Sequence, residues 1–411
     1  MAGREQSGSV VRGTTNNRSR IPIMDFTYTD EQQAVRDMVR AFARNEIAPI
    51  ADECDRSESF SYDTWRRLAE LGVINMNFPQ DCGGSEAGML AMCLAVEEVC
   101  YHDSSYGPVF TAQQTCCRHI LRYANEPQRS QWIEEYVLPI SRGVAFGATA
   151  LTEPNSSSSD AASMSTFARR DGDEWVINGN KMYSTAAGLE GAKFVIVWAI
   201  VDKQTRKSGL FLVPYGTPGF TVGSKLHKMG MRAADTRELF FTDCRIPAAH
   251  ILNGGAAGQA SPFKSDTQYH SKLFLASNAI GLQRYCLDQA IDFAKQRKTW
   301  GVPLSERQRI QGWIAEMVAD IQISTLLRDR AAVLYEAGTL SAADSAILKY
   351  VSAENAVKAS HYASEIFGGM GYMDGVGVSR RYRDAKGLTI IQGGSTLFKW
   401  IIAQETLREA G

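Results

Sequence analysis

The hydrophobic period of the chain changes twice, and the two changes divide it into three segments. Apolar residues recur at helical spacing up to residue 145, alternate as in β-strands from Ala145, and return to helical spacing in long segments after Ser271. A chain of 411 residues is longer than one hydrophobic core usually supports, so separate packed modules are expected. This order predicts an α+β protein with an N-terminal helical domain at residues 25–145, a middle antiparallel β domain at 146–262 and a C-terminal four-helix bundle at 263–411.

Capping signals place several helix ends. Thr29 and Gln32 have the spacing of a capping box, which predicts a helix from about Asp30. In the bundle, Ser341 is expected to cap the third helix, and the last helix is expected to begin near Ser395.

Composition excludes several classes of protein. A net charge of -1 provides neither the basic surface that nucleic acid needs nor a polybasic signal for membranes, and apolar runs such as Phe194 to Val201 are too short to span a bilayer. The eight cysteines show no CxxC spacing and no paired histidines, so we expect reduced thiols in a cytoplasmic protein, with neither disulfides nor a metal site. Residues 1–24 are rich in Ser, Thr, Asn, Gly and Arg and are expected to be a disordered extension.

The stretch from Ala148 to Thr185 contains two short segments that suit a flat cofactor. Leu151-Thr152-Glu153-Pro154 precedes a serine-rich loop, and Lys181-Met182-Tyr183-Ser184-Thr185 follows an Asn-Gly turn. Hydroxyls and backbone N–H groups at strand ends suit a ring that needs directional hydrogen bonds rather than charge. Taken alone, the stretch is also compatible with a serine-rich surface loop beside a hairpin.

Five segments occur in the order and with the spacing of one known family. From about residue 25 to the C-terminus the chain resembles the acyl-CoA dehydrogenases, flavoproteins that carry FAD. The segments are Leu151-Thr152-Glu153-Pro154, Asn178-Gly179-Asn180-Lys181-Met182-Tyr183-Ser184-Thr185, Lys228-Met229-Gly230-Met231-Arg232 through Asp235-Thr236-Arg237, Arg297-Lys298-Thr299-Trp300-Gly301, and Phe367-Gly368-Gly369-Met370-Gly371-Tyr372.

The resemblance implies that the middle domain holds the flavin ring. Leu151 and Thr152 would approach its pyrimidine side, and Thr185 would present a hydroxyl or amide near N5, where the hydride arrives. Tyr183 would stack against the ring; its alternative is a strand aromatic in the core.

The resemblance places the rest of FAD on the bundle. The Arg297 guanidinium suits bidentate binding of pyrophosphate, and in the family this segment serves the FAD of a neighbouring subunit, which implies a homo-oligomer, either a dimer or a tetramer. Gly368 and Gly369 would let the backbone approach the adenosine diphosphate. Taken alone, Arg297-Lys298 is equally compatible with an ordinary basic last turn of a helix, and Gly368-Gly369 with a plain helix C-cap. The remaining residues assigned to FAD are Ser159, Thr299, Trp300, Gln308, Glu365 and Ser395.

Two departures from the family concern the catalytic base. Family members remove an α-proton with a glutamate, which most carry just before the last helix and a minority carry at the start of the first bundle helix. These positions are Gly393 and Ser271 here, and neither can act as a carboxylate. Lys272 could hold a substrate carboxylate or, with a lowered pKa, accept a proton, and Tyr269 and His270 are further candidates for proton transfer. The alternative for Lys272 is a solvated lysine at a helix start.

Three functions remain open from the sequence. The first is an FAD-dependent oxidoreductase acting on an acyl thioester, carried by CoA or an acyl carrier protein, with an electron-accepting flavoprotein or molecular oxygen as partner. The second is a flavin enzyme whose substrate, a β-keto acid or a sulfinate, generates its own enolate by losing carbon dioxide or sulfite and is oxidised or monooxygenated. The third is a catalytically silent subunit that kept the scaffold.

Overall fold

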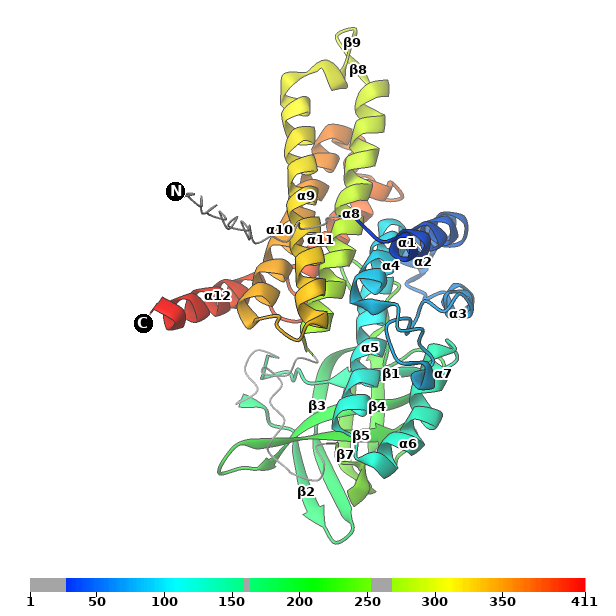
Figure 1. The fold of residues 1–411 in the computed structure, drawn as a ribbon, viewed down its shortest axis with the longest axis vertical. Helices are drawn as coiled ribbons and strands as arrows, with labels where there is room; N and C mark the ends of the chain where they lie inside the picture. Colours follow the sequence, from blue (N-terminus) through cyan, green and yellow to red (C-terminus); the bar gives the residue numbers. More distant parts are fainter. Residues whose placement is uncertain (1–26, 158–162, 253–267, 411) are drawn as a thin grey trace, which may run out of the picture.

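The computed structural model describes residues 27–157, 163–252 and 268–410. The predicted extension at residues 1–24 and the predicted cofactor residue Ser159 lie outside this part. Figure 1 shows a β-sheet at one end of the molecule, long helices at the other, and the N-terminal helices along one side of both. No helix within the described ranges combines the length and the apolar composition needed to cross a membrane.

The N-terminal part is helical, and its first helix begins where its cap predicts. The backbone N–H of Gln32 donates to the Thr29 hydroxyl (3.2 Å), and the backbone N–H of Thr29 donates to the Gln32 side chain (3.1 Å). The helix α5 was not predicted, because buried polar residues such as Gln113 and Gln114 interrupt its apolar pattern. The helices are α1 (Asp30–Phe42), α2 (Ala51–Ser57), α3 (Tyr62–Glu70), α4 (Gly88–His102), α5 (Tyr106–Tyr123), α6 (Glu126–Trp132) and α7 (Leu138–Ser141).

The middle part is a seven-stranded sheet in the order β1-β4-β2-β3-β7-β6, with β5 paired to β4. The prediction of an antiparallel module needs a correction, because β1 runs parallel to β4 and β2 makes one parallel pairing with β4. The β2–β3 hairpin lies between β1 and β4 in the chain, and this long connection lets β4 return in the direction of β1. The strands are β1 (Phe146–Ala150), β2 (Phe167–Asp171), β3 (Glu174–Thr185), β4 (Ala192–Asp202), β5 (Lys207–Pro214), β6 (Phe220–Lys225) and β7 (Thr236–Pro247).

Strand β4 is buried on both faces, which joins the sheet to the helices. Phe194, Ile196 and Trp198 belong to the large core shared with the N-terminal helices, whereas Val195 and Val197 belong to the core of the β domain. Alternate side chains of a strand point to opposite faces, so one strand serves both cores. The sheet is thereby fixed against α5, on which part of the site is built.

The C-terminal part contains the four predicted helices and one more. The Ser341 hydroxyl caps α10 as predicted, accepting from the backbone N–H of Asp344 at 3.0 Å. The helix α11 packs against α8 and α10; its buried face includes Arg380, Arg381 and Asp384, so hydrophobic periodicity could not reveal it. The elements are α8 (Tyr269–Gln296), the hairpin β8 (Lys298–Thr299) and β9 (Val302–Pro303), α9 (Gln308–Glu336), α10 (Ala342–Phe367), α11 (Gly377–Leu388) and α12 (Ser395–Ala410).

Candidate functional site

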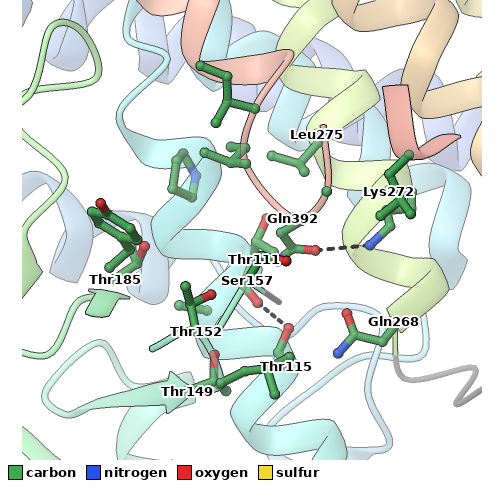
Figure 2. Close-up of a pocket in the computed structure, with 18 of the residues that line it drawn as sticks. Thr111, Thr115, Thr149, Thr152, Ser157, Thr185, Gln268, Lys272, Leu275 and Gln392 are labelled. Atoms are coloured by element: carbon green, nitrogen blue, oxygen red, sulfur yellow. Dashed lines mark hydrogen bonds between the residues drawn. The ribbon is translucent and has the colours of Figure 1, made fainter. Parts of the chain in front are cut away.

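A cavity of about 660 Å³ lies where the sheet, α5, α8 and the segment before α12 meet. Its volume is typical of sites for small molecules and cofactors, roughly 300–1,000 Å³. Figure 2 shows Thr152 and Thr185 of the β domain on one side and Lys272 of α8 on the other, with Gln392 between them. The two groups of residues that the sequence singled out therefore face the same space.

The wall formed by the β domain contains four of the predicted flavin residues: Leu151, Thr152, Tyr183 and Thr185. The hydroxyls of Thr152 and Thr185 make no hydrogen bond with another residue in the described ranges, so both are available to a ligand. The Tyr183 side chain is 62% exposed, which rules out the core aromatic considered as its alternative. Its backbone has a φ of 60°, a left-handed conformation that non-glycine residues rarely adopt and that often marks functional sites.

A buried ion pair supports this wall. The Lys181 Nζ donates to Glu153 Oε1 at 2.8 Å and to the Leu151 carbonyl at 3.0 Å, and both charged side chains are almost fully buried. Burial opposes ionisation of Glu153, but the charge of Lys181 and hydrogen bonds from Lys181, Ser165 and Thr166 outweigh it and lower the Glu153 pKa to about 2. The segment after β1 is thus fixed to β3, which also donates from the Met182 N–H to the Thr152 carbonyl.

The opposite wall places one cation against the cavity. The Lys272 residue is 8% exposed, and its Nζ lies 3.4 Å from Ser271 Oγ and 3.4 Å from Gln392 Oε1. Burial lowers the pKa of Lys272 to about 8. This rules out the solvated helix-start lysine that was its alternative. Tyr269 also lines the cavity.

Ser271 and His270 are turned away from the cavity. The Ser271 hydroxyl donates to the Gln268 carbonyl at 2.6 Å, and the His270 Nε2 lies 3.1 Å from the Thr115 hydroxyl. Burial first, with the nearby charge of Arg118, holds the pKa of His270 well below its usual range. Neither side chain lines the cavity, so the structure leaves Lys272 and Tyr269 as the titratable groups that α8 presents there.

No aspartate or glutamate is found among the described residues that line the cavity. Gly393, the position that the resemblance assigns to the base, is buried and has a φ of 107°. A Cβ atom there would lie 3.0 Å from Phe398 and 3.1 Å from Leu397. A side chain at this position is therefore strained by the backbone conformation and would require Phe398 and Leu397 to shift.

A lysine that the sequence analysis did not identify anchors this segment. Lys349 of α10 is 1% exposed, and its Nζ donates to the carbonyls of Leu388 and Gly393, the latter at 3.2 Å. Burial, and then the charge of Lys272, lower the pKa of Lys349 to about 7. The available signal was a lysine at helical spacing from Ala346 and Ala353 on the buried face of α10, since charged residues are rarely buried there without a role.

The other predicted cofactor residues form a second group outside the cavity. The hairpin that contains Thr299 and Trp300 lies at the end of the bundle away from the sheet in Figure 1. Phe293 and Phe367 stack with ring centroids 4.2 Å apart, which brings the C-terminal ends of α8 and α10 together there. The remaining members of this group are solvent exposed: Arg297, Gln308, Glu365, Gly368 and Gly369.

Ser395 belongs to neither group. Its hydroxyl is buried and makes no hydrogen bond with another residue in the described ranges, and the residue does not line the cavity. A single chain therefore gathers the predicted flavin-ring residues at one place and the predicted phosphate and adenine residues at another.

The chain matches three family profiles that together cover most of its length. They are described as the N-terminal, middle and C-terminal domains of acyl-CoA dehydrogenase, at residues 29–137, 148–244 and 266–407 respectively. These boundaries follow the three segments of the hydrophobic pattern.

Individual relatives match over nearly the whole chain. A probable acyl-CoA dehydrogenase of Bacillus subtilis is 36% identical, with 94% of this chain and 100% of the relative covered. The mitochondrial short-chain specific acyl-CoA dehydrogenase of Mus musculus is 35% identical over 92% of this chain and 90% of its own length. The solved structure of butyryl-CoA dehydrogenase from Megasphaera elsdenii superimposes with a TM-score of 0.87 and 31% identity, covering 93% of this chain and 100% of that one.

Proposed function

This chain belongs to the acyl-CoA dehydrogenase family, and from that premise we propose that it is an FAD-dependent oxidoreductase. It binds an acyl-CoA in the cavity between β3 and α8. It acts on the α-proton of the acyl group without a glutamate at either family position. The observation that supports this most directly is the lining of the cavity around Gly393. No aspartate or glutamate is found among the described residues of that lining.

The residues present fit the flavin ring. Thr152 and Thr185 offer hydroxyls that no described residue uses, Tyr183 is held with its side chain out of the core, and the Glu153–Lys181 pair fixes the strand ends that carry them. FAD, when bound, supplies the hydride acceptor for oxidation of the acyl group. The part played by this chain is to orient the ring, exclude water, and place Lys272 and Tyr269 beside the substrate.

The decisive experiment is anaerobic reduction of the bound flavin. Purified enzyme is mixed with butyryl-CoA without oxygen, and bleaching of the flavin absorbance is followed in the wild type and in Lys272→Ala. We expect bleaching by the wild type and a slower reaction in the variant. A protein that retains FAD, binds butyryl-CoA and shows no bleaching with any acyl-CoA would instead be the catalytically silent subunit.

A second candidate function is favoured by Lys272, a cation beside a cavity that lacks carboxylates. A β-keto acid that loses carbon dioxide keeps the electron pair of the broken C–C bond as an enolate, and a nearby ammonium would stabilise that negative charge. Release of labelled carbon dioxide from a β-keto acid labelled in its free carboxylate would support this route, whereas bleaching by butyryl-CoA without gas release supports the first. Oxygen uptake during turnover would distinguish molecular oxygen from an electron-accepting flavoprotein as the partner.

We also propose that FAD is shared between two copies of the chain. The exposed group at Arg297 and Gly368 is separated from the cavity within one copy, and Trp300 and Tyr372 beside it are 92% and 87% exposed. Large exposed apolar side chains beside a group of predicted FAD residues that lies apart from the cavity are expected to be covered by another subunit.

A further inference from the structure

Lys272 is a buried cation that has no partner of opposite charge among the described residues. The hydrogen-bond neighbours of its Nζ in that part of the chain are neutral, Ser271 Oγ and Gln392 Oε1, both at the long distance of 3.4 Å. The structure shows no ion pair between Lys272 and a carboxylate of the described residues. A buried ammonium without a counter-charge is costly, and a bound anion would remove that cost.

The surroundings of Lys272 strengthen its preference for an anion. The Phe398 ring lies between two lysines, with its centroid 5.8 Å from the Lys272 Nζ and 5.2 Å from the Lys349 Nζ. The other charged or titratable groups that bear on this corner are Arg118, the buried histidines His119 and His270, and Glu354, whose charge acts on Lys349. Among these groups Lys272, Lys349 and Arg118 are cations and Glu354 is the one acid, so this corner of the cavity has a net positive potential.

The pKa of Lys272 distinguishes its two candidate roles, which are to bind a substrate carboxylate and to accept a proton. With a pKa of about 8, the side chain is charged at pH 7, with roughly one molecule in ten neutral. A protonated amine cannot accept the α-proton of a substrate. It can bind an anion, and the negative charge of that anion would raise the lysine pKa, against the effect of burial, and stabilise the pair.

We propose that the acyl group of the substrate carries a carboxylate that pairs with Lys272 inside the cavity. This inference rests on the proposed function and specifies the substrate class. The neighbouring Gln392 supplies an amide group that can turn its NH₂ toward the same carboxylate, because it already faces Lys272 across the cavity (Figure 2). The site thus selects acyl thioesters of dicarboxylic acids over simple fatty acyl thioesters of equal length.

The test compares two thioesters with four-carbon acyl groups, succinyl-CoA and butyryl-CoA. Binding to the FAD-containing enzyme is measured at pH 7 by titration calorimetry and by the change in flavin absorbance. We expect the wild type to bind succinyl-CoA at least about 10-fold more tightly, since hydrogen bonds to charged groups are the stronger ones. In Lys272→Met the preference should disappear because succinyl-CoA binds more weakly.

Two further variants and a pH series keep the test decisive. Lys272→Arg should retain the preference, and Lys399→Met, on the exposed side of α12, should leave it unchanged. In the wild type the preference should fall as the pH rises above about 8, where free Lys272 loses its charge. If Lys272→Met does not fold, the comparison of the two thioesters in the wild type and its pH dependence still test the inference.

Equal affinity of the wild type for the two thioesters, or a preference that persists in Lys272→Met, would overturn the inference. In that case reduction of the flavin by butyryl-CoA would leave the proposed function intact. If neither thioester binds or perturbs the flavin, the proposed function itself fails.

Discussion

Gly393 shows at the scale of one residue why a carboxylate cannot simply be introduced by substitution. The sequence predicts that Gly393→Glu returns the carboxylate to its family position. The structure predicts otherwise, because a φ of 107° disfavours any side chain and a Cβ would contact Phe398 and Leu397. We expect Gly393→Glu to lower the free energy of unfolding by about 1–3 kcal/mol and to give no increase in flavin reduction by butyryl-CoA.

A matched control is available next to it. A Cβ at Gly394 would meet only the Thr389 carbonyl, at an ordinary distance of 3.9 Å. Gly394→Ala should therefore unfold at the denaturant concentration of the wild type. A Gly393→Glu enzyme that is stable and reduces its flavin faster would show that only the carboxylate had been lost.

At the scale of elements, the Glu153–Lys181 pair connects the end of β1 to β3. Replacing Glu153 by Gln leaves Lys181 buried without its counter-charge, and removing one partner of a buried pair typically costs about 3–5 kcal/mol. We expect Glu153→Gln to lower the free energy of unfolding at pH 7 and to weaken FAD binding, measured by denaturant unfolding and by flavin fluorescence. The double variant Glu153→Leu/Lys181→Met removes both charges and should be closer to the wild type in stability.

The same pair gives a pH dependence with a definite sign. Because the folded-state pKa of Glu153 is lowered to about 2 from its usual value near 4.5, its stabilisation is complete above pH 4.5 and is lost as the pH falls toward 2. The difference in unfolding free energy between wild type and Glu153→Gln should therefore shrink over that range. A difference that stays constant down to pH 2 would contradict the assignment.

Lys349 fixes another element, the segment from Leu388 to Gly393. Lys349→Met removes the donor to both carbonyls, so we expect faster hydrogen exchange in residues 389–394, measured by mass spectrometry, with α10 itself unchanged. Lys358→Met is the matched control, because Lys358 lies on the same helix and makes surface ion pairs with Glu316 and Asp320. Equal exchange in the two variants would show that the segment does not depend on Lys349.

The elements that the sequence predicted are those whose apolar residues follow a regular period or whose ends carry a cap. The Thr29 and Ser341 caps are of this kind. The helices α5 and α11 were missed because their buried faces contain polar residues that pair with distant parts of the chain, as Gln113 does with the backbone of Gly147. Such hydrogen bonds form only when distant parts of the chain pack together, and the local pattern of apolar residues does not contain that information.

At the scale of the whole molecule, the sequence identified residues for the site but could not place them. Lys272 and Gly393 are more than 100 positions apart, and only the fold brings them to one wall. Motif spacing also cannot show that Arg297 lies away from Thr152 within the chain. That separation becomes visible only when the bundle is seen to extend beyond the sheet (Figure 1).

This separation leads to a prediction about assembly. If the exposed end of the bundle completes the FAD site of another copy, Arg297→Ala should weaken FAD binding about 10-fold or more although Arg297 does not line the cavity, because a charge-assisted contact to phosphate is lost. FAD affinity is measured by fluorescence titration, and the mass of the assembly by sedimentation. Lys295→Ala is the control, because Lys295 is an exposed lysine in the last turn of α8 whereas Arg297 follows the end of that helix.

Trp300→Ser should lower both the mass of the assembly and the FAD affinity, because the exposed indole would be lost from the interface. A monomer that binds FAD as tightly as the wild type would show that one chain holds the whole cofactor.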